Sequence, residues 1–396
     1  MPVINSIANA KDEMSAWRHE LHQNPQTCYE EEFASNFVKQ KLTEWGIPFK
    51  DGIAVTGIVA TIEGQSTSSG KSIGLRADMD ALDITEKTNL PHASKTTGKM
   101  HACGHDGHTS TLLGVARHLN ETKNFNGTVY LIFQPAEEGG AGAHRMMAEG
   151  LFKDFPMDAV YGYHNWPMEP KGKIGMRAGP LMACSDRVNI SVTGKGGHAA
   201  MPHMTIDPMI VSAHIITALQ SIVSRNVDPI DQAVISITNM NCGTGAENII
   251  ADTAEITGSI RAFTEETRRL LEKRIPEICE NVAKAFGAEA SAEYVRGYDP
   301  TINSAAETDI CATVARELVG EDNVDTGTPP CMGAEDFGAF LTEKPGCYIF
   351  MGQGEADEKS PHNQSLHSPY YDYNNEILPL AASYFAKLVE KTLPTE

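Results

Sequence analysis

Hydrophobic positions in the first part of the chain predict short strands that alternate with helices. Apolar side chains recur at helical spacing over residues 31–45 and stop at a glycine, which predicts an amphipathic helix. A second helix is expected to be capped by Asp106 and to run to His118. Strands are predicted by apolar, β-rich runs at 53–62, 72–76, 128–133 and 158–163. This alternation indicates an α/β sandwich on a mixed or largely parallel sheet.

The middle of the chain repeats this alternation on a smaller scale. A strand, a helix, two strands, a helix and a strand are predicted in turn at 187–193, 206–225, 233–240, 253–263, 265–286 and 290–295. This split β-α-β order predicts a ferredoxin-like unit of four strands and two helices. After residue 297 a helix, a strand and a terminal helix are expected at 305–318, 347–351 and from Asn374. We therefore expect residues 184–297 to be a unit inserted into a discontinuous domain of residues 1–183 and 298–396.

Composition and charge argue against several classes of function. The chain has 396 residues, enough for two domains, and its 41% hydrophobic content is typical of a globular protein. An acidic excess gives a formal net charge of −20, which disfavours nucleic-acid and anionic membrane partners. The sequence has neither a long apolar run nor a signal-peptide pattern, so we expect a cytoplasmic protein. Its eight cysteines show no clustered spacing, which argues against a disulfide framework.

One short segment concentrates groups that bind metals. His101-Ala-Cys103-Gly-His105-Asp106-Gly-His108 places a thiol and three imidazoles just before the second predicted helix. Cys103 and His105, two residues apart, can turn to the same side of an extended segment, where a thiolate and an imidazole suit a borderline-soft divalent ion. The alternative is that these side chains only cap the helix and hydrogen-bond locally.

Other chemically capable residues follow predicted strands. Glu137 and Glu138 stand where the strand at 128–133 ends, and adjacent carboxylates can divide metal binding from general-base chemistry. His164 follows the strand at 158–163, and Asp78 and Asp80 close the strand that begins at Ser72. Ligand-type residues therefore gather at the carboxyl ends of strands, where open α/β sheets form their sites.

Four further candidates are weaker when taken alone. His367 lies in a loop before the terminal helix and gains weight only as an additional ligand. His198 stands in a glycine-rich turn of the inserted unit, and Asn248 is a polar residue in an apolar run. Arg261, in a similar run, suits either the binding of a substrate carboxylate or a structural ion pair.

Together these motifs resemble those of the co-catalytic metallohydrolases that include hippurate hydrolases, aminoacylases, auxin-conjugate amidohydrolases and related carboxypeptidases. The resemblance spans essentially the whole chain, through Gly74-Leu-Arg-Ala-Asp78-Met-Asp80, His101 to His108, Gln134-Pro-Ala-Glu137-Glu138, His164-Asn-Trp-Pro, Gly194-Lys-Gly-Gly-His198, Met332-Gly-Ala-Glu335-Asp336-Phe and His367-Ser-Pro. The chain departs from the family pattern at Asp83, where proline is usual, and at Gln26-Thr-Cys28-Tyr.

The resemblance implies an α/β catalytic domain with an inserted ferredoxin-like lid and dimerisation domain. It implies two divalent ions, of Zn, Mn, Co or Ni, held by Cys103, His105, Glu138, His164 and His367. Glu137 matches the general base, and Asp80 matches a carboxylate that orients a ligand. Cys103 occupies the place where more distant relatives use a bridging aspartate.

The lid has its own implied roles. His198 matches a residue that polarises the scissile carbonyl, often across a dimer, while Asn248 and Arg261 match residues that bind the substrate carboxylate. The lid usually supplies the dimer contact in this family, so we expect a homodimer or homotetramer.

The expected reaction is hydrolysis of the amide bond of a small N-acyl amino acid by a metal-activated water. A dipeptidase or carboxypeptidase of the same family is the nearest alternative. A non-catalytic amino-acid-binding protein and a thiol enzyme with Cys103 as nucleophile are more distant ones. Metal removal would leave the thiol enzyme active and abolish the hydrolase.

Overall fold

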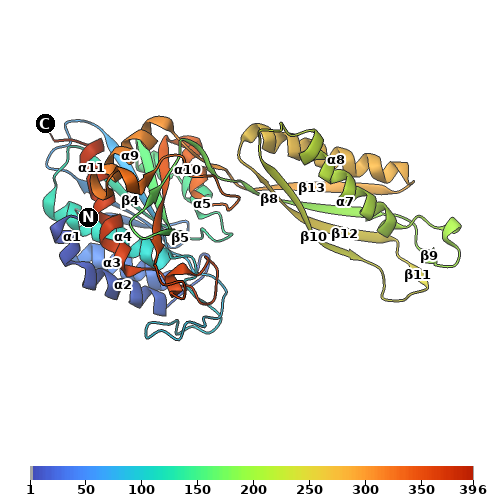
Figure 1. Ribbon diagram of the computed structural model, residues 1–396, viewed down its shortest axis with the longest axis horizontal. Helices are drawn as coiled ribbons and strands as arrows, with labels where there is room; N and C mark the ends of the chain where they lie inside the picture. The colour runs from blue at the N-terminus through green and yellow to red at the C-terminus, as the bar shows by residue number, and fades with distance from the viewer. Residues whose placement is uncertain (1–2, 396) are drawn as a thin grey trace. The chain divides into compact units, whose positions relative to one another are not determined.

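The computed structural model describes residues 3–395, and the chain forms two compact units (Figure 1). The first unit contains Met1–Leu181, Ile302–Pro329 and Asp336–Glu396. The second contains Met182–Thr301 and Pro330–Glu335. In the described part of the chain, no helix is both long and apolar enough to cross a membrane.

An eight-stranded mixed sheet forms the centre of the first unit, in the order β1-β2-β4-β3-β5-β16-β6-β15. Its strands are β1 (Phe49–Ile53), β2 (Gly57–Glu63), β3 (Ser72–Asp78), β4 (Thr128–Gln134), β5 (Ala159–Pro170), β6 (Ile174–Gly175), β15 (Val324–Asp325) and β16 (Gly346–Gly354). The central strands β4, β3, β5 and β16 run parallel to one another, and β1 and β2 add antiparallel strands beside β4. Both faces of the central strands are buried, as expected where helices cover a parallel sheet on both sides.

Helices cover both faces of this sheet. Ile73, Leu75 and Ala77 of β3 share one core with six helices, which are α1 (Asn5–Asn9), α2 (Lys11–Gln23), α3 (Glu32–Glu44), α4 (His105–Thr122), α9 (Ala305–Val319) and α11 (Leu378–Thr392). Three short helices contact the opposite face or one another: α5 (Gly142–Ala148), α6 (Leu151–Asp154) and α10 (Phe337–Glu343). Short 3-10 turns lie at Pro202–Met204, Glu321–Asn323, Pro361–Asn363 and Asn375–Ile377.

The start of α4 differs from its prediction. The helix begins at His105 and its N-cap is Gly104, so the expected cap at Asp106 is wrong. Gly104 has a φ of 97°, and a Cβ there would lie 2.3 Å from Oδ1 of Asn165, so this turn accepts only glycine. Asp106 lies inside the first turn instead, with Oδ2 at 2.7 Å from Nδ1 of His22.

Two strand predictions also need correction. The run at 53–62 is not one strand, because Ala54 and Val55 take positive φ values and form a turn between β1 and β2. The strand predicted to end at Tyr163 continues to Pro170, because its backbone stays paired in parallel with β16 as far as Trp166 and Pro170. His164 therefore lies inside β5 and does not follow it.

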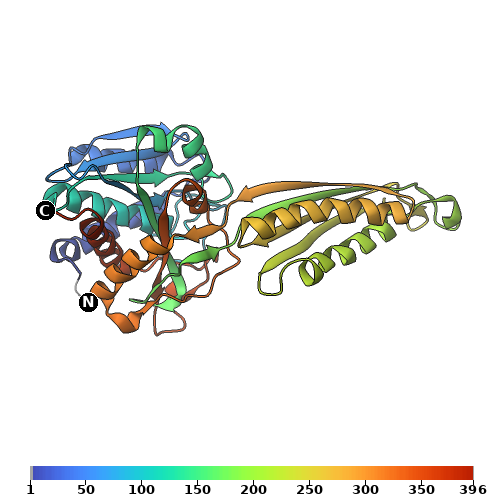
Figure 2. The ribbon, with the colours of Figure 1, turned by 90° about the horizontal axis from the view of Figure 1, so that it is seen from above.

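The second unit is an antiparallel sheet with two helices on one face. Its strands β8 (Ser185–Thr193), β10 (Ala233–Cys242), β12 (Thr253–Ala262) and β13 (Glu289–Tyr298) lie in the order β10-β12-β8-β13. Figure 2 shows α7 (Pro208–Arg225) and α8 (Glu265–Ala285) side by side along this sheet. Burial alternates along β12, so one face meets the helices and the other meets solvent. This is the ferredoxin-like order predicted from the sequence.

Two small pairs of strands complete the fold. β9 (Gly197–His198) pairs with β11 (Ile249–Ile250), and β7 (Gly179–Met182) pairs with β14 (Thr301–Asn303).

Candidate metal centre

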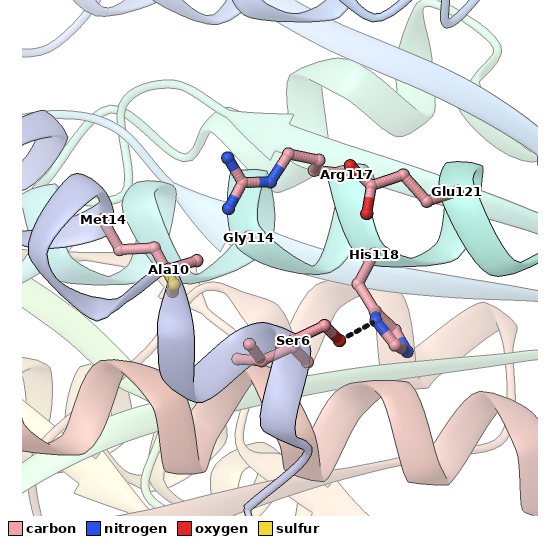
Figure 3. A pocket seen from close by; sticks show the side chains of 8 residues that line it. Ser6, Ala10, Met14, Gly114, Arg117, His118 and Glu121 are labelled. Carbon is pink, nitrogen blue, oxygen red and sulfur yellow. Dashed lines mark hydrogen bonds between the residues drawn. The ribbon is translucent and has the colours of Figure 1, made fainter.

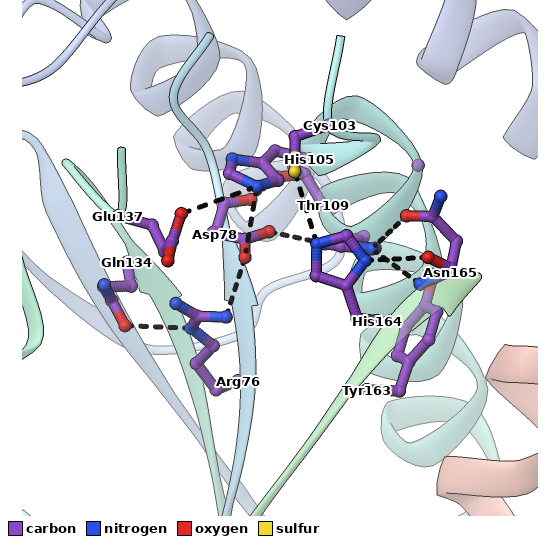
Figure 4. Close-up of polar contacts among 12 residues, drawn as sticks. Arg76, Asp78, Cys103, His105, Thr109, Gln134, Glu137, Tyr163, His164 and Asn165 are labelled. Carbon is purple, nitrogen blue, oxygen red and sulfur yellow. Dashed lines mark hydrogen bonds and ion pairs between the residues drawn. The ribbon is translucent and has the colours of Figure 1, made fainter. Parts of the chain in front are cut away.

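The first unit brings all five expected metal ligands into one cluster. Ligand atoms of Cys103, His105 and His164 lie within 4.8 Å of one another, and so do those of Cys103, Glu138 and His367. His105 forms a further such group with Glu137 and Glu138. Figure 4 shows Asp78, Cys103, Glu137 and His164 arranged around His105. Local capping of one helix does not explain why these residues meet, because they come from β5, α4 and three separate loops.

His105 and His164 each present the same ring nitrogen to the cluster. Nδ1 of His105 lies 2.9 Å from the backbone oxygen of Asp80 and 3.2 Å from its Oδ1, so this nitrogen carries a proton. Nδ1 of His164 lies 2.8 Å from the backbone oxygen of Asn165. Each Nε2 is thereby left to the cluster, an arrangement typical of metal-binding histidines. Nε2 of His164 lies 3.3 Å from Sγ of Cys103, and Nε2 of His105 is buried without a hydrogen-bond partner.

The electrostatics of the cluster favour a cation. Burial lowers the pKa of His105, but Asp78, Asp80 and Glu138 outweigh this effect and raise the pKa to about 10. Burial, together with the carboxylates of Glu138, Glu137 and Asp78, raises the pKa of the Cys103 thiol well above its usual value. Where no other cation is present, the cluster therefore holds protons on Cys103 and His105. A divalent ion would replace these protons, so the residues fit a metal site chemically.

Glu138 and His367 close one side of the cluster. Oε1 of Glu138 lies 3.0 Å from Nε2 of His367, whose side chain is 52% exposed, so this edge is open to solvent. Burial raises the pKa of Glu138, but His367 and His105 outweigh it and lower the pKa. The backbone N–H of His367 donates to the oxygen of Ala102 at 2.8 Å, which ties this distant loop to the segment before α4.

The adjacent residues Glu137 and Glu138 face different partners. Ala136, just before them, has a φ of 57°, and Gly139, just after them, has a φ of 88°. Glu137 receives the backbone N–H of Asp336 on Oε1 at 3.3 Å, and its Oε2 lies 4.0 Å from Nε2 of His105. Glu137 thus reaches the edge of the cluster, while Glu138 reaches His367.

Asp78 and Asp80 play distinct structural parts. Asp80 contacts His105 through Oδ1 and receives the backbone N–H of Glu138 on Oδ2 at 2.8 Å. Asp78 lies 2.6 Å from Nδ1 of His108 and receives a hydrogen bond from Arg76 at 2.7 Å. Burial raises the pKa of Asp78, but Arg76, His105 and His108 hold it well below its usual value.

Sequence reasoning gave no role to two buried residues beside the cluster, Arg76 and Asp336. Arg76 donates to Asp336 at 3.0 Å and to Oε1 of Gln134 at 2.9 Å. Both residues lie in motifs that carry the family resemblance. Their place in those motifs could therefore have marked them as candidate site residues. They connect Asp78 with the loop that carries Glu137.

Two of the three candidates of the second unit, His198 and Arg261, lie on different sheets, and Asn248 directly precedes β11. His198, on β9, is exposed and pairs with Ile249 of β11, and the backbone oxygen of Asn248 accepts the N–H of Ala199 at 2.9 Å. Arg261 is half-buried on β12. The structure therefore brings His198 and Asn248 together. The roles of all three toward a substrate stay predictions.

A separate pocket lies where α1, α2 and α4 meet (Figure 3). It encloses about 100 Å³, with Met14 packed against Gly114 and Oγ of Ser6 3.2 Å from Nδ1 of His118. Its lining includes none of the candidate site residues.

Comparison with known proteins decides the family. The model described as Peptidase family M20/M25/M40 matches residues 74–391. The chain belongs to this family. The family resemblance read from the motifs is therefore confirmed, and membership of a hydrolase family makes the chain an enzyme, contrary to the alternative of a non-catalytic binding protein.

Relatives of this M20 protein cover almost all of its length. The hippurate hydrolase of Campylobacter jejuni is 42% identical over 393 residues, which cover 99% of this chain and 100% of the relative. Thermostable carboxypeptidase 2 of Saccharolobus solfataricus is 36% identical over 400 residues and covers 99% of each chain. The crystal structure of the Bacillus subtilis YXEP protein, described as a dinuclear metal-binding peptidase of the M20 family, has a TM-score of 0.84 and 33% identity. It covers 98% of this chain and 100% of its own, and it confirms the α/β fold class.

Proposed function

We propose that this M20 protein is a metal-dependent amidohydrolase that cleaves the amide bond of small N-acyl amino acids. The observation that carries the proposal is the largely buried cluster, in which Glu137 stands beside candidate thiol, imidazole and carboxylate ligands. The similarity to a hippurate hydrolase along the whole chain supports the substrate class.

The proposed ligands are Cys103, His105, Glu138, His164 and His367. Two divalent ions of Zn, Mn, Co or Ni, when bound there, would lower the pKa of a water molecule and polarise the substrate carbonyl. Asp80 fixes the ring of His105 and the backbone of Glu138, so it orients two of these ligands at once.

Glu137 is the proposed general base. Its carboxylate takes a proton from water while the water oxygen forms a bond to the carbonyl carbon. The same carboxyl group then gives that proton to the amine nitrogen as the carbon–nitrogen bond breaks, and an acid and a free amino acid leave. Held on Oε1 by the N–H of Asp336, Glu137 keeps Oε2 directed to the cluster.

The second unit is proposed to complete the site. His198 would polarise the scissile carbonyl, and Asn248 and Arg261 would bind the substrate carboxylate. Residues 184–297 would act as lid and as the contact surface of a homodimer or homotetramer. These assignments rest on the family motifs.

The first experiment is a hydrolysis assay with benzoyl-glycine, acetylated amino acids and simple dipeptides. Activity is measured before and after chelation, and again with each of the four metals restored. We expect metal-dependent release of free amino acid from the acylated substrates. Activity that survives complete chelation would overturn the proposal and favour a thiol enzyme.

The role of Glu137 is tested by Glu137→Gln, with Glu63→Gln on the exposed end of β2 as matched control. The proposal expects Glu137→Gln to keep its metal content and to lose turnover by about 10²- to 10⁴-fold. A Glu137→Gln variant that binds metal and has normal turnover would show that Glu137 is not the general base.

A dipeptidase or carboxypeptidase is the second candidate function, and the similarity to thermostable carboxypeptidase 2 favours it. The same assay separates the two functions. Preference for dipeptides with a free amino group over their acylated counterparts would replace the first proposal with the second.

A further inference from the structure

Three buried carboxylates hold the loop that carries Glu137. Asp80 accepts the backbone N–H of Glu138 at 2.8 Å, and Asp336 accepts that of Ala143 at 2.9 Å. The third is Glu31, which accepts the backbone N–H of Ala136 on Oε1 at 2.9 Å although it lies 105 residues away in sequence. Neither the motifs nor the proposed mechanism gives Glu31 a role.

The side chain of Glu31 is directed toward this loop and away from its own helix. Glu31 occupies the N-cap position of α3, yet it makes no side-chain hydrogen bond to that helix. It is fully buried, while its neighbours Glu30 and Glu32 are exposed. Helix capping therefore does not account for this carboxylate.

Further hydrogen bonds fix the carboxylate of Glu31 in place. Oε2 accepts the hydroxyl of Thr56 at 2.6 Å, and Oε1 also accepts the backbone N–H of Tyr29 at 2.9 Å. With Ala136 included, both oxygens are engaged by donors from three separate segments. Such a group holds its position well, because each bond restricts the rotamer that the others need.

The residue that Glu31 holds is conformationally demanding. Ala136 takes a φ of 57°, in the left-handed region that disfavours residues with a Cβ. The backbone oxygen of Ala136 accepts the N–H of Gly142 at 3.0 Å, so both backbone polar groups of Ala136 are hydrogen-bonded. Because Glu137 follows directly, the backbone at Ala136 sets the direction in which the Glu137 carboxylate leaves the loop. Strained backbone of this kind persists only where its surroundings enforce it.

We propose that Glu31 is a positioning residue for Glu137: by binding the N–H of Ala136, it fixes the turn that directs Glu137 into the metal centre. This inference rests on the proposed role of Glu137 as general base. Glu31 touches neither the proposed ligands nor the reacting atoms, so its effect passes through the loop.

Three variants test the proposal. Glu31→Leu removes the acceptor and leaves the N–H of Ala136 without it, so we expect kcat to fall about 10- to 100-fold, the size of effect that a small misplacement produces. Metal content and KM should stay within about twofold of the unchanged protein. Glu31→Gln keeps an acceptor oxygen for Ala136, and it should restore most of kcat. Glu32→Leu, at the exposed neighbouring position, is the matched control.

A double variant provides the readout that a purely structural role would not change. If Glu31 acts through Glu137, Glu31→Leu should cause no further loss of kcat in a Glu137→Gln background. A full additional loss there, or an unchanged kcat in the single variant, would overturn the inference. If Glu31→Leu does not fold, Glu31→Asp replaces it, because it keeps the charge but shortens the reach, and the same loss is expected. An active, metal-loaded Glu137→Gln would instead refute the proposed base, a result that does not depend on Glu31.

Discussion

Asp80 accepts the backbone N–H of Glu138 at 2.8 Å, and its other carboxylate oxygen lies 3.2 Å from Nδ1 of His105. One buried side chain thus orients two proposed metal ligands, one at the start of α4 and the other in the loop that follows β4. The contact with His105 also fixes which ring nitrogen is free to bind a metal.

Replacement of Asp80 should therefore weaken metal binding. We expect Asp80→Ala to lower metal affinity about 10- to 100-fold, because His105 and Glu138 lose their common support. The affinity is measured by competition with a chromophoric chelator. Asp83→Ala, at an exposed position three residues along the chain, should bind metal as the unchanged protein does. Equal affinity in both variants would show that Asp80 does not orient the ligands.

Cys103 separates the proposed hydrolase from a thiol enzyme. Reactive thiols lie in electropositive surroundings, but burial and three carboxylates raise the pKa of Cys103. We expect Cys103→Ala to lose metal and activity, and Cys103→Asp to keep a measurable share of both, because a carboxylate also binds divalent ions. Metal content and turnover are measured together. Activity in metal-free Cys103→Ala would contradict the role of Cys103 as a metal ligand. A Cys103→Asp variant that binds metal but is inactive would instead favour Cys103 as the nucleophile of a thiol enzyme.

The residues of the candidate site differ in how far the sequence predicts them. Cys103 and His105 stand close together in the chain, so their chemistry and their spacing are enough to mark them as a pair of metal ligands. Glu31 stands in an acidic run that looks like a solvated helix start, and only its contact with Ala136 gives it a part in the site. Sequence patterns cover only neighbouring residues, so they cannot predict a contact between residues 105 positions apart.

The end of strand β5 could not be predicted from the sequence for the same reason. Its apolar run ends at Tyr163, and the chain beyond it reads His-Asn-Trp-Pro. The strand nevertheless continues, because hydrogen bonds to β16 maintain it. Element order was predictable from periodicity, whereas this boundary depended on a partner strand nearly 200 residues away.

His22 makes the stability of the first unit depend on pH. Burial lowers its pKa, but the hydrogen bond to Asp106 and the carboxylate of Glu86, 3.3 Å from Nε2, outweigh burial and raise the pKa to about 9 from 6.5. A pKa raised by folding adds stability that is fully present below about pH 6.5 and is lost as the pH rises through about 9. The shift corresponds to roughly 3 kcal/mol of unfolding free energy.

The measurement compares the unchanged protein with His22→Gln by urea unfolding at several pH values. Their difference in unfolding free energy should be largest near pH 6 and should shrink toward pH 10. This comparison cancels the pH dependence of metal binding, which both proteins share. His214→Gln, at an exposed position of α7, should show no such trend. A difference that does not vary with pH would mean that folding does not shift the pKa of His22.

Arg268 should control the stability of the second unit. Its guanidinium donates to both oxygens of Asp186 at 2.7 Å and to Asp299 at 2.5 Å, and its side chain is 1% exposed. Arg268→Ala leaves Asp186 buried without its cation, so we expect a loss of about 3–5 kcal/mol. Arg269→Ala, with a side chain that is 73% exposed, should change stability by less than about 0.5 kcal/mol.

The positions of the tryptophans allow this loss to be localised. All three, Trp17, Trp45 and Trp166, belong to the first unit, so their fluorescence reports its unfolding alone, while circular dichroism reports both units. In Arg268→Ala the dichroism should begin to change at lower urea concentration, and the fluorescence midpoint should stay where it is. If both signals shift together, the two units unfold as one and the loss is not confined to the second. If neither shifts, the ion pair of Arg268 with Asp186 adds nothing to stability.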